Sequence, residues 1–237
     1  MNYISNLTMK NFLTLAILVV VVACASDTEQ KSLHDIGATY NAKTAYSKNF
    51  KSSVGEKTVR AFTVTVSESK LIDSLNPNVS SSNIALMVYE NLSEKEKDHY
   101  TAINVNLLNL KKDSANYTFQ KQTLSELSEK AATFNTFAES LIKGNFGKID
   151  EIKDANEIKG TVAHGVKKLI AKNKKLHGDL IGYKRFGIAE ARDERGSAYQ
   201  FQGFLEFENG KLIPFLGVVD TALGKDKLIG FNIFDKS

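Results

Sequence analysis

The sequence predicts an α+β fold in two parts, a small βαββ-type first half followed by two helices packed on a curved antiparallel sheet. Apolar residues recur at helical spacing over residues 123–143 and 161–176, which is typical of helices that bury one face. Apolar and polar residues alternate over residues 58–66 and 198–208, as in half-buried strands. The pair Asn209-Gly210 then favours a hairpin, which implies antiparallel pairing.

These patterns divide the chain into a signal segment at residues 1–23, a tether at 24–31, a small α+β domain at 32–122 and a second domain at 123–237. Hydrophobic residues make up 42% of the chain and charged residues 24%, as in ordinary globular proteins. The net charge of +4 is spread along the sequence, whereas nucleic-acid binders gather basic residues on one face, so we expect no nucleic-acid partner. The single cysteine excludes an internal disulfide.

The chain opens with the features of a secretion signal. An apolar run of about a dozen residues, from Phe12 to Ala23, follows the cation Lys10. The run is too short for a membrane-spanning helix, which needs about 20 residues, and suits the apolar region of a signal peptide. Residues 1–8 fit the start of a signal poorly, so Met9 is an alternative start to Met1.

The residues Val21-Val22-Ala23-Cys24 resemble the bacterial lipobox. The resemblance implies a diacylglyceryl group on the Cys24 Sγ, cleavage before Cys24 and acylation of the new amine. One acyl chain anchors only marginally, whereas three anchor stably. The alternatives are an ordinary signal peptide cut at Ala23 or Ala25, or an uncleaved span. Ala25 and Ser26 follow the cysteine, and the lack of Asp there favours the outer membrane under the sorting rule of some Gram-negative lipoproteins.

Alternating and helical patterns organise the first half. Residues 32–50 carry apolar side chains at near-helical spacing and predict a short amphipathic helix. Residues 58–66 alternate and predict a strand. The rest of the first half is expected as a turn at Asn76-Pro77-Asn78, a helix over 83–91 capped by Ser80 or Ser81, a charged loop over 94–98 and strands over 100–110 and 117–120.

Capping and turn residues delimit the second half. The segment Thr123-Leu124-Ser125-Glu126 reads as a capping box, so a helix is expected from there to Lys143, ended by Gly144. A polar stretch separates it from a second helix, which Gly178 closes. Asn209-Gly210 predicts a type I′ turn, in which both residues take positive φ. The strands are expected over 181–192, 198–208, 211–219 and 227–234.

The order of two helices and an antiparallel meander resembles the nuclear transport factor 2-like (cystatin-like cone) superfamily. The residues that carry the resemblance are Ala132, Phe134, Phe137, Leu141, Gly144, Phe146 and Ile149, together with the segment 203–212. It covers about half of the chain and implies a cone-like domain, in which a helix lies across a bent sheet with a pocket between them. That superfamily includes enzymes and pure binding modules, so fold alone does not give function.

Four residues of the second half are candidates for acid–base chemistry. They are His164, Asp220, Tyr183 and Tyr199, because cone-fold enzymes place such a set in their pocket. The competing interpretation makes His164 and Asp220 solvated and the tyrosines ordinary core residues. The histidines lack metal-ligand spacing and no Gly-x-Ser-x-Gly occurs. The sequence therefore predicts no catalytic, metal or cofactor site.

The sequence favours a non-enzymatic binding protein of the bacterial cell envelope, held at the membrane by lipid on Cys24. Its expected partners are the membrane and either a small ligand or an envelope protein. Two alternatives stay open. The first is a cone-fold enzyme, an isomerase, dehydratase or hydrolase. The second is a structural component of an envelope assembly.

Overall fold

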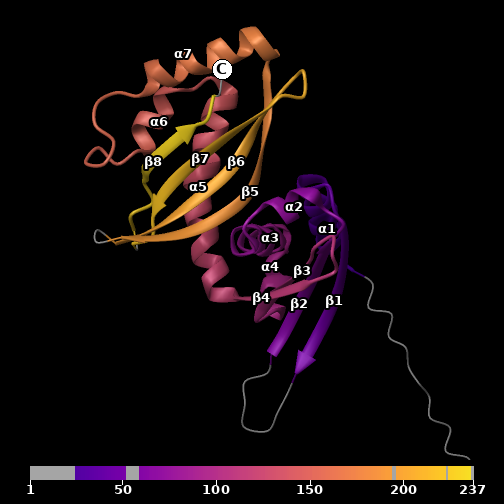
Figure 1. The fold of residues 1–237 in the computed structure, drawn as a ribbon. Coiled ribbons are helices and arrows are strands. Elements are labelled where there is room, and N and C mark those ends of the chain that lie inside the picture. Colours follow the sequence, from indigo (N-terminus) through magenta and orange to yellow (C-terminus); the bar gives the residue numbers. More distant parts are fainter. Residues whose placement is uncertain (1–24, 52–58, 194–195, 223, 236–237) are drawn as a thin grey trace, which may run out of the picture.

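The computed structural model describes residues 25–51, 59–193, 196–222 and 224–235. Residues 1–23 and Cys24, on which the predicted signal and lipid site fall, lie outside the described residues. The described part contains seven helices and two four-stranded sheets, so the predicted α+β class is confirmed (Figure 1). None of the helices in this part is long and apolar enough to cross a membrane.

The first sheet has the spatial order β1-β2-β3-β4, with β2 and β3 parallel and the outer pairs antiparallel. Its strands are β1 (Lys43–Lys51), β2 (Val59–Ser67), β3 (Ala102–Leu108) and β4 (Ser114–Gln120). The helices before β4 are α1 (Asp27–Tyr40), α2 (Lys70–Ser74), α3 (Pro77–Asn91) and α4 (Glu94–His99). The predicted βαββ unit is present from β2 to β4, and α1 and β1 precede it.

The two faces of the first sheet differ in chemistry. One face buries Phe62, Val64 and Val105 against α1 and α3. The opposite face carries short uncharged polar residues that bond across strands: the Asn104 Nδ2 donates to Thr63 Oγ1 at 3.2 Å and the Thr118 hydroxyl donates to Asn104 Oδ1 at 2.9 Å. The alternation of apolar and polar side chains along each strand therefore gives the sheet one buried apolar face and one polar face.

The predicted tether at 24–31 and helix at 32–50 are both corrected. α1 begins at Asp27, because the Ser26 hydroxyl and the Glu29 carboxylate form a capping box there. The helix ends at Tyr40, where Asn41 takes a left-handed conformation with φ of 46°. The chain then continues as β1, an edge strand that pairs only with β2 within the described residues.

Two predicted loops of the first half are helical. The expected turn at Asn76-Pro77-Asn78 is the start of α3: the Asn76 side chain accepts from the backbone amide of Asn78 at 2.9 Å, and Pro77 occupies the first helical position. The expected charged loop at 94–98 is α4. Ser93 and Glu96 form its capping box, so the charges lie on a short helix.

Helix α5 (Lys121–Lys143) follows β4 directly. The capping box predicted at residues 123–126 is wrong, because the helix has already begun at Lys121, whose amide donates to the Thr101 carbonyl at 3.0 Å. The predicted end is confirmed by Gly144, with φ of 68°. The predicted boundary between residues 122 and 123 thus falls inside the first turn of a continuous helix.

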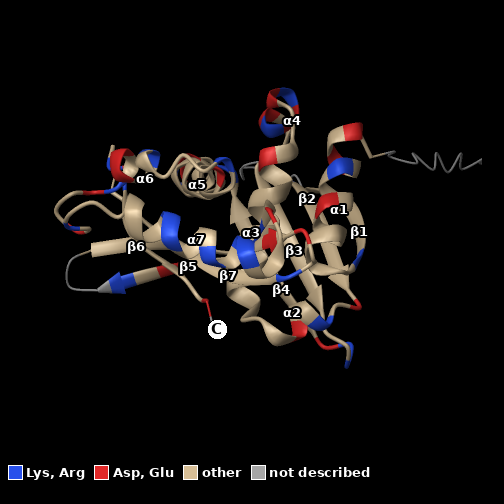
Figure 2. Ribbon diagram, turned by 90° about the horizontal axis from the view of Figure 1, so that it is seen from above, with Lys and Arg blue, Asp and Glu red and all other residues tan. Residues whose placement is uncertain are grey.

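Two further helices follow α5. They are α6 (Gly147–Ile152), in the stretch described from the sequence only as polar, and α7 (Ala163–His177), which confirms the second predicted helix. Gly178 closes α7 with φ of 82°. Lysines or arginines occur beside aspartates or glutamates on both α4 and α6 (Figure 2). Charge of both signs is therefore mixed on these helices.

The second sheet is an antiparallel meander. Its strands are β5 (Leu180–Asp193), β6 (Gly196–Phe207), β7 (Leu212–Asp220) and β8 (Leu228–Ile233). Helices α5 and α7 pack on one face: Phe134 of α5 stacks on Phe201 and Phe215, with ring centroids 5.4 and 5.2 Å apart, and His177 meets the Phe207 ring. The predicted alternation along β6 is confirmed by the buried odd-numbered residues.

The hairpin at Asn209-Gly210 is confirmed, but its predicted type I′ turn is wrong. The Phe207 amide donates to the Lys211 carbonyl at 3.0 Å, which encloses a three-residue loop. Gly210 takes a φ of 81°, whereas Asn209 does not take a positive φ. The loop instead matches the three-residue hairpin in which a glycine follows the turn in the left-handed region.

The two sheets meet where α1 and α3 contact β5. The Tyr40 hydroxyl donates to the Phe186 carbonyl at 2.8 Å, and the Asn83 amide donates to the Arg185 carbonyl at 2.9 Å. These bonds satisfy carbonyls of β5, the edge strand of the second sheet. The buried hydrophobic residues of both halves form one contiguous cluster. The two halves therefore share a core.

Candidate functional site

The four acid–base candidates do not come together. His164 lies exposed on α7. Tyr183 contacts Phe134, and Tyr199 contacts Phe201, so both tyrosines lie on the helix-covered face of the second sheet. Asp220 follows Val219, which is paired with Tyr199, so alternation puts Asp220 on the opposite face. The four candidates that the cone-fold resemblance implies therefore lie apart: two on one face of the second sheet, one on the other face and one on α7.

The two tyrosine hydroxyls are held in their protonated form. Burial raises the pKa of Tyr183, whose hydroxyl donates to Asn135 Oδ1 at 3.0 Å. Burial, with the Glu190 carboxylate, also raises the pKa of Tyr199. The space between α5 and the sheet, where the resemblance places a pocket, is occupied by the stacked ring of Phe134. Neither tyrosine hydroxyl therefore has the lowered pKa that would make it readily ionised at neutral pH.

Asp220 instead borders a hollow on the face of the second sheet that is opposite to α5 and α7. The hollow has a volume of about 460 Å³ and crosses all four strands at one end of the sheet. Small residues form its floor, because Ala191, Ala198 and Gly230 project little into it. Its other lining residues are Asp154, Asn156, Glu157, Arg192, Gly196, Ser197, Val218, Asp220, Lys225 and Ile229.

Charges of both signs border the hollow. Arg192 Nη2 lies 2.8 Å from a Glu190 carboxylate oxygen, and Lys225 Nζ lies 3.8 Å from an Asp220 carboxylate oxygen. The Asp220 carboxylate also accepts from the Ala222 amide at 2.8 Å, which fixes its orientation. Asp154 accepts from the Asn156 amide at 2.7 Å in the same way. The arrangement can bind a small ligand that carries both charges.

A buried lysine supports the turn that carries Lys225. Lys130 of α5 donates from its Nζ to the Ala222 carbonyl at 2.7 Å and pairs with Asp226 at 2.8 Å, while its own side chain is buried. The Thr133 hydroxyl donates to the Asp226 carbonyl at 2.9 Å. Helix α5 therefore positions the β7–β8 turn, which carries Lys225 at the edge of the hollow.

Sequence reasoning found Asp220 but missed Arg192, Lys225 and the floor of the hollow. A signal for the floor existed, because Ala191, Ala198 and Gly230 are small residues in three of the predicted strands. Which strand ends lie side by side is decided only by the register of the meander.

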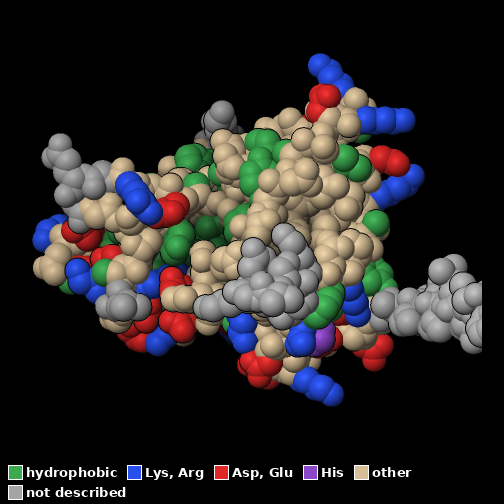
Figure 3. Space-filling model, turned by 90° about the horizontal axis from the view of Figure 1, so that it is seen from below, with side chains coloured by type: hydrophobic (Ala, Val, Ile, Leu, Met, Phe, Trp, Pro, Cys, Tyr) green, Lys and Arg blue, Asp and Glu red, His purple; other side chains and the backbone are tan. Residues whose placement is uncertain are grey.

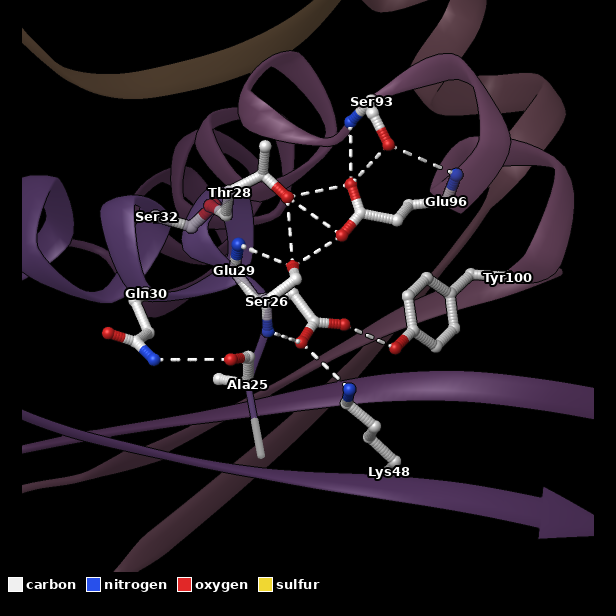
Figure 4. A network of polar contacts seen from close by, with 10 residues as sticks. All are labelled: Ala25, Ser26, Thr28, Glu29, Gln30, Ser32, Lys48, Ser93, Glu96 and Tyr100. Atoms are coloured by element: carbon white, nitrogen blue, oxygen red, sulfur yellow. Dashed lines mark hydrogen bonds and ion pairs between the residues drawn. The ribbon is translucent and has the colours of Figure 1, made fainter. Parts of the chain in front are cut away.

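The residues that follow Cys24 are fixed to the folded body by a polar network (Figure 4). The buried Glu29 carboxylate accepts from the Ser26 amide at 2.8 Å and from the Tyr100 hydroxyl at 2.6 Å, and it pairs with Lys48 at 2.8 Å. Burial alone would raise the pKa of Glu29, but these bonds outweigh it and lower the pKa. The Glu29 carboxylate, ionised at neutral pH, thus ties α1 to β1.

Glu96 of α4 completes this network. Its carboxylate accepts from the Thr28 hydroxyl at 2.6 Å, from the Ser93 amide at 2.8 Å and from the hydroxyl of Ser26. Burial raises the pKa of Glu96, but the hydrogen bonds dominate and lower it to about 2. Ser26 is therefore fixed only two residues after Cys24, in the stretch predicted to be a tether.

The described residues contain no group of three or more potential metal ligands. Comparison of the chain with protein-family models, with curated proteins and with solved structures finds no match.

Proposed function

We propose that this chain is a non-enzymatic, lipid-anchored binding protein of the bacterial cell envelope, with lipid on Cys24 and a ligand site in the hollow beside Asp220. The hollow carries the proposal. Its volume of about 460 Å³ lies within the range of small-molecule sites, and it combines an apolar floor with a few charged groups. The lipobox resemblance at residues 21–24 supports the anchor.

The charges favour a small zwitterionic ligand, such as a short peptide. Arg192 and Lys225 suit a carboxylate, while Asp154 and Asp220 suit an ammonium group, and all four line the same hollow. A binding role is favoured over catalysis because the acid–base candidates are separated between the two faces of the sheet and α7. The cone-like fold remains a proposal, consistent with α5 lying across the second sheet.

The ligand site is tested by filling the hollow. Ala198→Leu would place a larger side chain on the floor, and Ala45→Leu on the exposed face of β1 is the matched control. We expect a defined mixture of di- and tripeptides to give heat of binding with the wild type and the control but not with Ala198→Leu. Equal binding by all three proteins, or no binding by the wild type, would contradict the site.

The anchor is tested by intact mass and detergent partitioning beside a Cys24→Ser variant. We expect the wild-type mass to equal the chain from Cys24 plus acyl groups, and the variant to be uncleaved or lost from the detergent phase. An unmodified wild-type mass beginning at Ala25 or Ser26 would contradict lipidation. It would leave the test of the hollow unaffected, because the two experiments use different readouts.

A further inference from the structure

We propose that Phe50, near the end of β1, and Val59, at the start of β2, form a second membrane contact and enter the bilayer interface beside the lipidated cysteine. The inference rests on the proposed lipid at Cys24 and extends it. It assigns the side of the folded body that faces the lipid and the residues that touch it.

The first step is the position of Ser26. Its amide and the Lys48 Nζ both bond the same carboxylate oxygen, Glu29 Oε2, each at 2.8 Å. Cys24 is two residues away, so its Cα lies within roughly 7 Å of that of Ser26 in any conformation. Lipid on Cys24 therefore holds the bilayer surface close to this part of β1.

The second step is the direction of β1. Phe50 lies two residues beyond Lys48, so it faces the same side of the strand and sits about 6.6 Å further along. α1, which Lys48 contacts through Glu29, does not cover Phe50, which is 68% exposed. Val59 pairs with Lys51 and therefore faces the opposite side of the hairpin, where it is 43% exposed. Figure 3 shows the molecule from below, a side on which hydrophobic and basic side chains lie among polar and acidic ones.

The third step is the chemistry of this end. The Arg60 guanidinium lies 5.8 Å from the centre of the Phe50 ring and is itself exposed. An exposed aromatic ring beside a cation suits the interface of a bilayer, where the ring enters the acyl boundary and the cation meets anionic headgroups. A lipid surface is thus favoured over a protein partner, because the adjoining anchor already supplies it.

The absence of tryptophan from the sequence allows a direct measurement. Phe50→Trp gives the lipidated full-length protein a single indole at the proposed contact. Leu110→Trp and Leu176→Trp give matched controls, since these leucines are 53% and 59% exposed and lie after β3 and at the end of α7. Each protein is reconstituted into phosphatidylcholine–phosphatidylglycerol vesicles with and without brominated acyl chains.

We expect the brominated lipid to quench roughly half of the emission of Phe50→Trp and almost none of either control. Emission of Phe50→Trp that is unquenched, or quenched no more than the controls, would overturn the contact. Acylation of every sample is verified by intact mass beforehand. A protein without acyl groups would refute the anchor, whereas an acylated protein without quenching would refute only the hairpin contact.

Discussion

Asn83 and Arg185 exchange two hydrogen bonds across the junction between the two sheets. The Arg185 Nε donates to Asn83 Oδ1 at 2.6 Å, and the Asn83 Nδ2 donates to the Arg185 carbonyl at 2.9 Å. The Arg185 side chain is only 8% exposed and also pairs with Glu90 at 2.6 Å. A nearly buried cation of β5 thus takes two of its partners, Asn83 and Glu90, from α3.

Asn83→Ala should lower the free energy of unfolding by about 2–4 kcal/mol, because it leaves the Arg185 guanidinium and a β5 carbonyl without their buried partner. Asn116→Ala, on the exposed face of β4, is the control and should change it by less than about 0.5 kcal/mol. Urea denaturation measures both. Equal losses in the two variants would show that the junction contributes little.

Two asparagines on the polar face of β3 should respond in opposite directions. The Asn106 Oδ1 is buried without a hydrogen-bond partner among the described residues, so Asn106→Thr should stabilise the protein by about 0.5–1 kcal/mol. Asn104→Thr should destabilise it by about 1 kcal/mol, because Asn104 bonds Thr63 and Thr118. Thermal unfolding compares the two variants, and a fall in Tm for Asn106→Thr would contradict the expectation.

Two glycines of the second sheet should differ in their tolerance of a methyl group. A Cβ at Gly217 would lie 2.9 Å from a Phe134 ring carbon, so Gly217→Ala should cost about 1–3 kcal/mol through overpacking against α5. A Cβ at Gly230 would lie 3.6 Å from Val218, in ordinary contact, so Gly230→Ala should be nearly neutral. Denaturant midpoints for both variants test this difference, which equal midpoints would contradict.

The network around Glu96 should make stability depend on acid. Hydrogen bonds lower the pKa of Glu96 from its usual 4.5 to about 2 against the opposing effect of burial, so the unfolded chain binds a proton before the folded one. The stabilisation is complete above pH 4.5 and is lost as the pH falls toward 2. Glu96→Gln should remove this part of the acid dependence, measured as urea midpoints across that range. Parallel curves for both proteins would refute the assignment.

Sequence patterns predicted the elements whose signals are local. The alternation that ends at Phe207 and the glycines at 144 and 178 are read correctly, because strand pleating and left-handed helix ends depend on a few neighbouring residues. The strand Lys43–Lys51 was missed because it lies at the edge of its sheet and most of its side chains are exposed. The alternation of apolar and polar residues is therefore weak. The start of α5 was misplaced because a bond to Thr101 extends it beyond the apparent capping box.

The candidate site was less predictable than the fold. Asp220 could be singled out as a carboxylate at a strand end, but its separation from Tyr199 depends on which face of the sheet each residue takes. The hollow arises from small residues of separate strands, and the network at Ser26 joins residues about 70 positions apart. Such relationships depend on how strands pair and on which distant segments pack together, which no local pattern shows.

Helix α5 contacts both halves, so the number of residues between its two contacts fixes the angle between them about the helix axis. Near its start Leu124 lies with Tyr89 and Ile103 of the first half, while Phe134 stacks within the second sheet. Adding or deleting one residue between Leu124 and Phe134 would rotate the two contact faces by about 100° relative to each other. Substitutions on the exposed side of this helix can accumulate freely, but its length between the two sheets is fixed.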